Sequence, residues 1–193
     1  LLFPEFRNPL FLRLYCEGLG DDGPVVASEN ETGATKIFHG FLARINQRLA
    51  KASRLDFDQN CSLVQAAVGD FVRQIDTQGP RRLPRKVAQA AVDQHLPGRR
   101  YSKSLFQGLI SEGVLTEERV RAADGKWQDV VSVTYDRLAD YLLSVALLEE
   151  HRESTDEESG LVAYSAIREL FHDRAACYRN AGIAEALSVV LPE

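Results

Sequence analysis

Apolar residues recur at helical spacing through much of the chain. Over residues 35–55, apolar side chains fall at i, i+3, i+4, i+7 and i+11, which is the spacing of one buried helix face: Phe38, Phe41, Leu42, Ile45 and Leu49. Thr35 stands where the N-cap of this helix belongs. A broad apolar face over residues 62–76 predicts another helix, and shorter helices are predicted from Pro9 onward and after residue 160.

The pattern changes in the middle of the chain. Residues 84–95 and 102–112 predict two short helices, with a turn between them. Asp124 and Gly125 then indicate a tight β-hairpin, because both central residues of a type I′ turn need a positive φ. Trp127, Val131 and Val133 follow with the same parity, as in a strand with one buried face. Three helices followed by a hairpin is the order of elements in a winged helix.

Helical spacing returns at residue 136 and continues for about four turns. The sequence therefore predicts a mainly α protein: a helical bundle followed by a winged helix with one β-hairpin, then further helices. We place the bundle at residues 1–57 and the winged helix at residues 58–150. Residues 151–193 form a linker and the start of a C-terminal helical region.

Composition and motifs exclude several classes of protein. The chain of 193 residues is 45% hydrophobic, which is ordinary for a soluble globular protein. No apolar run reaches the roughly 18 residues that a membrane-spanning helix needs, so we expect a cytoplasmic protein with no membrane partner. The three cysteines show no metal-site or disulfide spacing. P-loop, dinucleotide, zinc-protease and serine-hydrolase motifs are all lacking, so no self-contained active site is predicted.

Charge is distributed unevenly. Residues 79–103 hold seven basic side chains and one acid, Asp93, whereas residues 149–158 are mostly acidic. Arg99, Arg100 and Lys103 lie at the entry to the third helix of the predicted winged helix, the helix that enters the major groove in DNA-binding members. The net charge of -5 and the acids of the hairpin favour instead a solvated basic face or an intramolecular contact.

Two stretches, "FPEFRNPLFLRLYCEGL" and "SLFQGLISEGVL...VVSVTYDRLADYLLSVALL", carry a family resemblance. They are similar to the C-terminal part of the nucleotide-binding module in STAND ATPases, the signal-transduction class that includes NACHT proteins. The similarity is greatest to large bacterial antiphage-defence members. In that family a P-loop core is followed by a small helical bundle and a winged helix, which together cover the bound nucleotide. The resemblance extends over residues 1–150 in layout, but its specific motifs occupy only about 35 positions.

The resemblance implies roles for three residues. Asn8-Pro9-Leu10 matches the place where a family proline contacts the adenine, and Tyr135 stands where a family histidine reaches the β-phosphate of ADP. A neutral phenol can donate one hydrogen bond to a phosphate but cannot become a cation, and Arg137 nearby can supply the charge. Without a nucleotide, Pro9 is simply a helix N1 proline. Tyr135 then closes the core, and Arg137 can pair with Asp140 across one helical turn.

The first hypothesis is therefore that the chain is a piece of a longer STAND-type ATPase. The resemblance implies ATP or ADP as cofactor, with Mg²⁺ bound by residues outside this chain. It also implies an upstream P-loop core and a downstream sensor region of the same protein as partners, and a homo-oligomer on activation. The alternatives are a winged-helix DNA-binding regulator, using Arg99, Arg100 and Lys103, and a helical protein-interaction scaffold.

Overall fold

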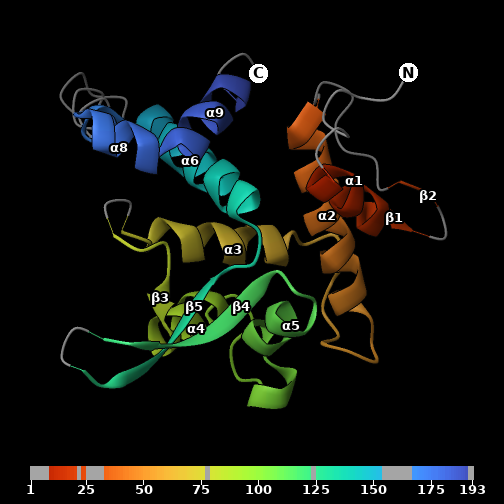
Figure 1. Ribbon diagram of the computed structural model, residues 1–193. Helices are drawn as coiled ribbons and strands as arrows, with labels where there is room; N and C mark the ends of the chain where they lie inside the picture. Colours follow the sequence, from red (N-terminus) through yellow and green to blue (C-terminus); the bar gives the residue numbers. More distant parts are fainter. Residues whose placement is uncertain are drawn as a thin grey trace. The chain divides into compact units, whose positions relative to one another are not determined.

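The computed structural model describes residues 9–20, 23–24, 33–76, 79–122, 125–153 and 167–190. It is mainly helical with a small antiparallel sheet, which confirms the predicted fold class (Figure 1). The helices are α1 (Pro9–Gly18), α2 (Gly33–Ala50), α3 (Leu63–Arg73), α4 (Arg85–Asp93), the short 3-10 helix η2 (Tyr101–Lys103), α5 (Leu105–Ser111), α6 (Asp136–Glu153), α8 (Arg174–Arg179) and α9 (Ala181–Val190). The strands are β1 (Leu19–Gly20), β2 (Gly23–Pro24), β3 (Leu83–Pro84), β4 (Leu115–Arg121) and β5 (Trp127–Val133).

The chain divides into two compact units that interleave along the sequence. Unit 1 comprises Leu1–Val68 and Lys86–Leu115, and unit 2 comprises Gly69–Arg85 and Thr116–Glu193. The domain boundaries predicted after residues 57 and 150 stay a prediction. Among the described residues, no helix is both long enough and apolar enough to cross a membrane.

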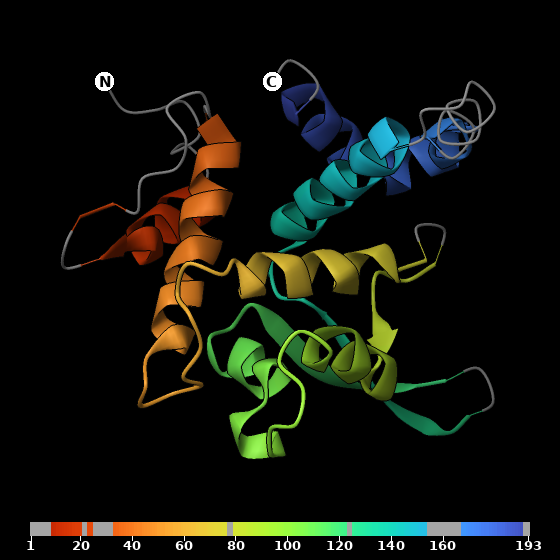
Figure 2. The same cartoon turned by 180° about the vertical axis from the view of Figure 1, so that it is seen from behind.

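In unit 1, α1 packs against α2, as both views of the ribbon show (Figures 1 and 2). The rings of Phe11 and Phe38 lie 5.4 Å apart at this contact. The apolar face predicted for α2 is buried along its whole length, and Ile45 and Leu49 are fully inaccessible to solvent. Periodic apolar spacing therefore located the helix that anchors the core of this unit.

The ends of the helices differ from the prediction. Thr35 is not the N-cap of α2, because the helix begins at Gly33 and the buried Thr35 hydroxyl has no hydrogen-bond partner. The helix ends at Ala50 rather than at residue 55. The helix predicted from residue 102 begins only at Leu105, because Ser104 is extended and its side chain accepts a hydrogen bond from the Gln107 backbone N–H.

Unit 2 contains the three-stranded sheet, in the order β3-β5-β4. β3 pairs antiparallel with β5, with Leu83 opposite Val131. The hairpin between β4 and β5 is confirmed, and Gly125 has the positive φ of 81° expected at its turn, while Asp124 lies outside the described residues. Trp127 does not share a buried face with Val131, because 64% of its surface is exposed at the outer end of β5.

The order α3, β3, α4, α5, β4, β5, together with the strand order of the sheet, is the chain connectivity of a winged helix. After β5 the chain enters α6, which packs against α9 within unit 2 (Figure 1). Leu138 and Leu143 of α6 and Ile183 of α9 are buried. Among the described residues, three ion pairs join α6 to other parts of the unit: Arg81 with Asp140, Arg73 with Glu149 at 2.5 Å, and Arg137 with Glu185.

Candidate functional site

The junction between β5 and α6 holds two of the residues that the resemblance singled out. Tyr135 is half-buried, and its carbonyl accepts the Ala139 N–H at 3.0 Å, which is the first hydrogen bond of α6. Tyr135 is therefore the residue at which strand geometry gives way to helix geometry. The predicted position of this junction is confirmed, since α6 begins at Asp136.

Arg137 lies in the first turn of α6 and pairs with Glu185 of α9. Both side chains are partly exposed, at 38% for Arg137 and 62% for Glu185. The predicted pairing of Arg137 with Asp140 is wrong, because the buried Asp140 carboxylate is occupied by Arg81. The charge of Arg137 is thus balanced from the C-terminal helix, in a position where solvent and other anions can compete for it.

Pro9 is the first residue of α1 and is exposed. A proline suits this position because its missing N–H would have no partner inside the helix. Asn8, the preceding residue of the matched motif, lies outside the described residues. Pro9 belongs to unit 1, whereas Tyr135 and Arg137 belong to unit 2.

The basic residues of the alternative hypothesis gather around η2 in unit 1. Arg99, Arg100 and Lys103 are all exposed. Arg99 donates to the backbone carbonyl of Asp56 at 3.2 Å, which ties the η2 segment to the turn after α2. Ser104 then caps α5, so the chain presents these cations on a fixed turn.

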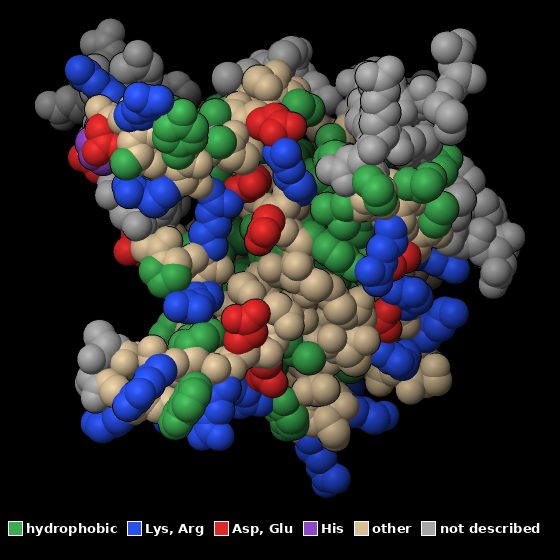
Figure 3. Space-filling view, viewed as in Figure 1, with side chains coloured by type: hydrophobic (Ala, Val, Ile, Leu, Met, Phe, Trp, Pro, Cys, Tyr) green, Lys and Arg blue, Asp and Glu red, His purple; other side chains and the backbone are tan. Residues whose placement is uncertain are grey.

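A pocket of about 320 Å³ opens beside this basic segment, within unit 1. It is lined by Leu49, Ser53, Arg54, Leu55, Ser102, Lys103, Gln107, Gly108 and Ser111. Leu49 and Leu55 are buried, whereas the two cations and the hydroxyl groups are exposed to solvent. In the space-filling view, Lys and Arg side chains gather at the lower right, over the end of α2 and the η2 segment (Figure 3).

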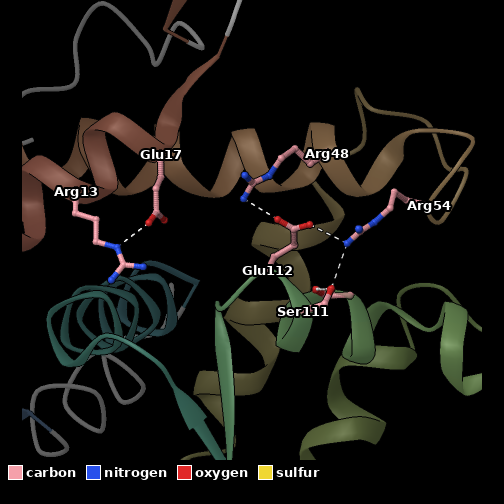
Figure 4. Close-up of polar contacts among 7 residues, drawn as sticks. Arg13, Glu17, Arg48, Arg54, Ser111 and Glu112 are labelled. Atoms are coloured by element: carbon pink, nitrogen blue, oxygen red, sulfur yellow. Dashed lines mark hydrogen bonds and ion pairs between the residues drawn. The ribbon is translucent and has the colours of Figure 1, made fainter.

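Glu112 pairs with two arginines, one of which, Arg54, lines this pocket. Arg54 donates to Glu112 Oε1 at 2.8 Å and to Ser111 Oγ at 3.2 Å, while Arg48 contacts Glu112 Oε2 at 2.6 Å (Figure 4). The Glu112 side chain is only 12% exposed. One carboxylate therefore holds two guanidinium groups, and Arg54 is fixed at the pocket wall.

Sequence reasoning found Lys103 but missed Arg48, Arg54 and Glu112. Arg54 and Glu112 lie 58 residues apart, and no local pattern relates them. In the part of the chain that the structure describes, no group of three His, Cys, Asp or Glu side chains is placed to hold a metal ion.

Comparisons of the chain with family models, with curated proteins and with solved structures found no match. The STAND resemblance therefore depends on the sequence motifs quoted above.

Proposed function

We propose that this chain is the regulatory part of a STAND-type signalling ATPase, in which the winged helix covers the nucleotide held by an upstream P-loop core. The observation that carries the proposal is the position of Tyr135. It stands where the last strand of a winged-helix connectivity enters the next helix, the place that the family gives to its phosphate-contacting residue. Arg137 follows within one helical turn.

The proposed mechanism is a two-state switch. With ADP bound, Tyr135 would donate a hydrogen bond to the β-phosphate and Arg137 would add positive charge, so the closed state would be favoured. Exchange for ATP would follow when a ligand sensed by the C-terminal region releases the winged helix. Such a switch needs contacts that differ between the two states, because a ligand shifts an equilibrium only by its differential affinity.

The Arg137–Glu185 pair supports a regulatory role for this junction. Glu185 lies on α9, in the C-terminal region that the family uses for sensing, and it competes with any phosphate for Arg137.

Under this proposal the protein acts in bacterial antiviral defence, oligomerises on activation and is cytoplasmic. ATP or ADP is its cofactor, Mg²⁺ and the hydrolytic residues belong to the upstream core, and Pro9 contacts the adenine.

The test is ADP retention in the protein that includes the segment upstream of Leu1. We expect Tyr135→Phe to release bound ADP several-fold faster, because the phenol can no longer donate to the phosphate. Tyr178→Phe is the matched control, since Tyr178 is 70% exposed on α8. Equal ADP release from the wild type and Tyr135→Phe would assign Tyr135 a packing role only. Absence of bound nucleotide in the wild type would overturn the proposal.

A second candidate function is DNA binding, which the exposed cations of the η2 segment favour. If Arg99, Arg100 and Lys103 neutralise phosphates, affinity for duplex DNA should fall steeply as salt increases, by roughly one power of the salt concentration per contact. A substitution of all three by Gln should then reduce this slope. If the protein does not bind duplex DNA at low salt, DNA binding is not its function.

A further inference from the structure

We propose that the pocket between the end of α2 and α5 is a binding site for a small organic phosphate. The pocket lies wholly in unit 1, and Tyr135 and Arg137 do not line it. Its volume of about 320 Å³ is at the lower end of the range of ligand sites in proteins, which run from about 300 to 1,000 Å³. The site therefore suits a molecule of a few functional groups rather than a bare ion.

The charged residues at the pocket favour an anionic ligand. Arg54 and Lys103 line the site, and the one carboxylate beside it, Glu112, pairs with Arg54 and with Arg48. Lys103 lines the pocket, and within the described residues it makes no ion pair. A phosphate would gain a charge-assisted hydrogen bond from Lys103, and Arg54 would add the field of a guanidinium already fixed in place.

The neutral hydrogen-bond donors of the pocket favour a ligand group that has several acceptor oxygens. Ser53, Ser102 and Gln107 line the same pocket, and none of their side chains has a hydrogen-bond partner among the described residues. A hydroxyl or an amide can donate to a phosphate oxygen without a further carboxylate to compete for it. Phosphate offers three terminal oxygens to this set of donors, whereas a carboxylate offers two.

The buried end of the pocket is apolar, which suits a ligand with a small apolar part. Leu49 and Leu55 line the pocket beside Gly108, and both leucines are almost fully buried against it. A Cβ at Gly108 would come within 3.2 Å of both leucines. Small-molecule sites usually combine an apolar lining with a few polar groups that fix the orientation of the ligand.

Phenyl phosphate is a suitable probe, because it joins a phosphomonoester to a small apolar ring and carries no adenine. We would titrate it into the isotopically labelled chain and follow the backbone amides by NMR. The expected result is saturable shifts at Gln107, Gly108 and Ser111, which phenol does not reproduce. Lys103→Gln should weaken binding about tenfold, as expected for the loss of one charge-assisted hydrogen bond.

The matched control is Arg100→Gln, because Arg100 is exposed three residues away and does not line the pocket. Unchanged affinity in this variant, with weakened affinity in Lys103→Gln, would support the site. Equal losses in both variants would mean non-specific attraction to the basic segment and would overturn the proposal, as would the absence of saturable shifts. A short DNA duplex that displaces the probe and loses affinity in both variants would reassign the surface to nucleic acid.

The outcome does not depend on the proposed lid function. Phenyl phosphate lacks the base that Pro9 would contact, and the shifts are read at residues of unit 1. Equal ADP release from the wild type and Tyr135→Phe would contradict the lid function and leave this site standing. A pocket that does not bind phenyl phosphate would leave the lid function standing.

Discussion

Arg81 and Asp140 form an ion pair that joins the segment before β3 to α6. Asp140 is 5% exposed, and the Arg81 side chain is 24% exposed. Burial lowers the pKa of the Arg81 guanidinium, and the nearby negative charge of Asp136 acts in the opposite direction. Arg81 also reaches the carbonyl of Arg179 at 3.5 Å, so one side chain connects three segments of unit 2.

Removing one partner of this pair should destabilise unit 2. We expect Asp140→Asn to lower the free energy of unfolding by about 2 kcal/mol, because a partly buried guanidinium would lose its counter-charge. Chemical denaturation measures the loss. Asp70→Asn is the control, since Asp70 pairs with the half-exposed Arg73 and should change stability by less than about 1 kcal/mol. Equal losses in both variants would show that the Arg81–Asp140 pair stabilises the fold no more than the exposed pair of Arg73 with Asp70.

Gly182 lies directly against the carboxylate of Asp140, in the first turn of α9. A Cβ at this position would overlap the carboxylate, so Gly182→Ala should push α9 away from α6. We expect a loss of about 1 to 3 kcal/mol, the usual cost of overpacking. Gly40→Ala in α2 should instead stabilise by about 0.5 to 1 kcal/mol, since nothing lies within 4 Å of its added methyl group. Thermal unfolding of both variants would show whether the signs differ.

Asn46 connects α2 to the start of α3. Its amide donates to the carbonyls of Gln59 and Cys61 at 3.0 and 2.9 Å, and its oxygen accepts the Val64 N–H at 3.1 Å. Asn46 is 3% exposed, so Asn46→Ala should cost about 2 to 3 kcal/mol through unsatisfied buried groups. Asn60→Ala, which removes only one exposed side-chain hydrogen bond to Asp58, should have little effect. A comparable loss in both variants would contradict this role of Asn46.

The N-cap of α8 should make that helix sensitive to acid. Asp173 accepts the Ala176 N–H, and this hydrogen bond lowers the pKa of Asp173 below the usual value of an aspartate. Because the folded pKa lies below the unfolded one, the stabilisation is present above the unfolded value and is lost as pH falls through the folded value. The Ala176 amide signal should report this loss on acidification. Asp173→Asn should keep the cap and remove the pH dependence.

The sequence alone could predict those elements whose apolar period is long or whose turn chemistry is specific. The five apolar positions of α2 are all buried, and Gly125 has the φ that the hairpin required. Both signals are local, because helix faces and tight turns are determined within a few residues.

Contacts between distant residues could not be predicted in the same way. β3 contains only Leu83 and Pro84, too few for a period to appear, and a strand this short is defined only by its pairing with β5. The partner of Arg137 was predicted within its own helix, but Glu185 lies 48 residues away. The pocket depends on the same kind of long-range contact, in which Glu112 meets two arginines at the end of α2.

The central claim is that the junction at Tyr135 responds to bound nucleotide, and hydrogen exchange across residues 133–139 tests it most directly. The measurement compares the protein that includes the upstream segment with and without ADP. The proposed function predicts that ADP slows exchange in this stretch, because the phosphate contact stabilises the first turn of α6. Unchanged exchange at residues 133–139, in a sample where ADP demonstrably binds elsewhere in the protein, would contradict the claim.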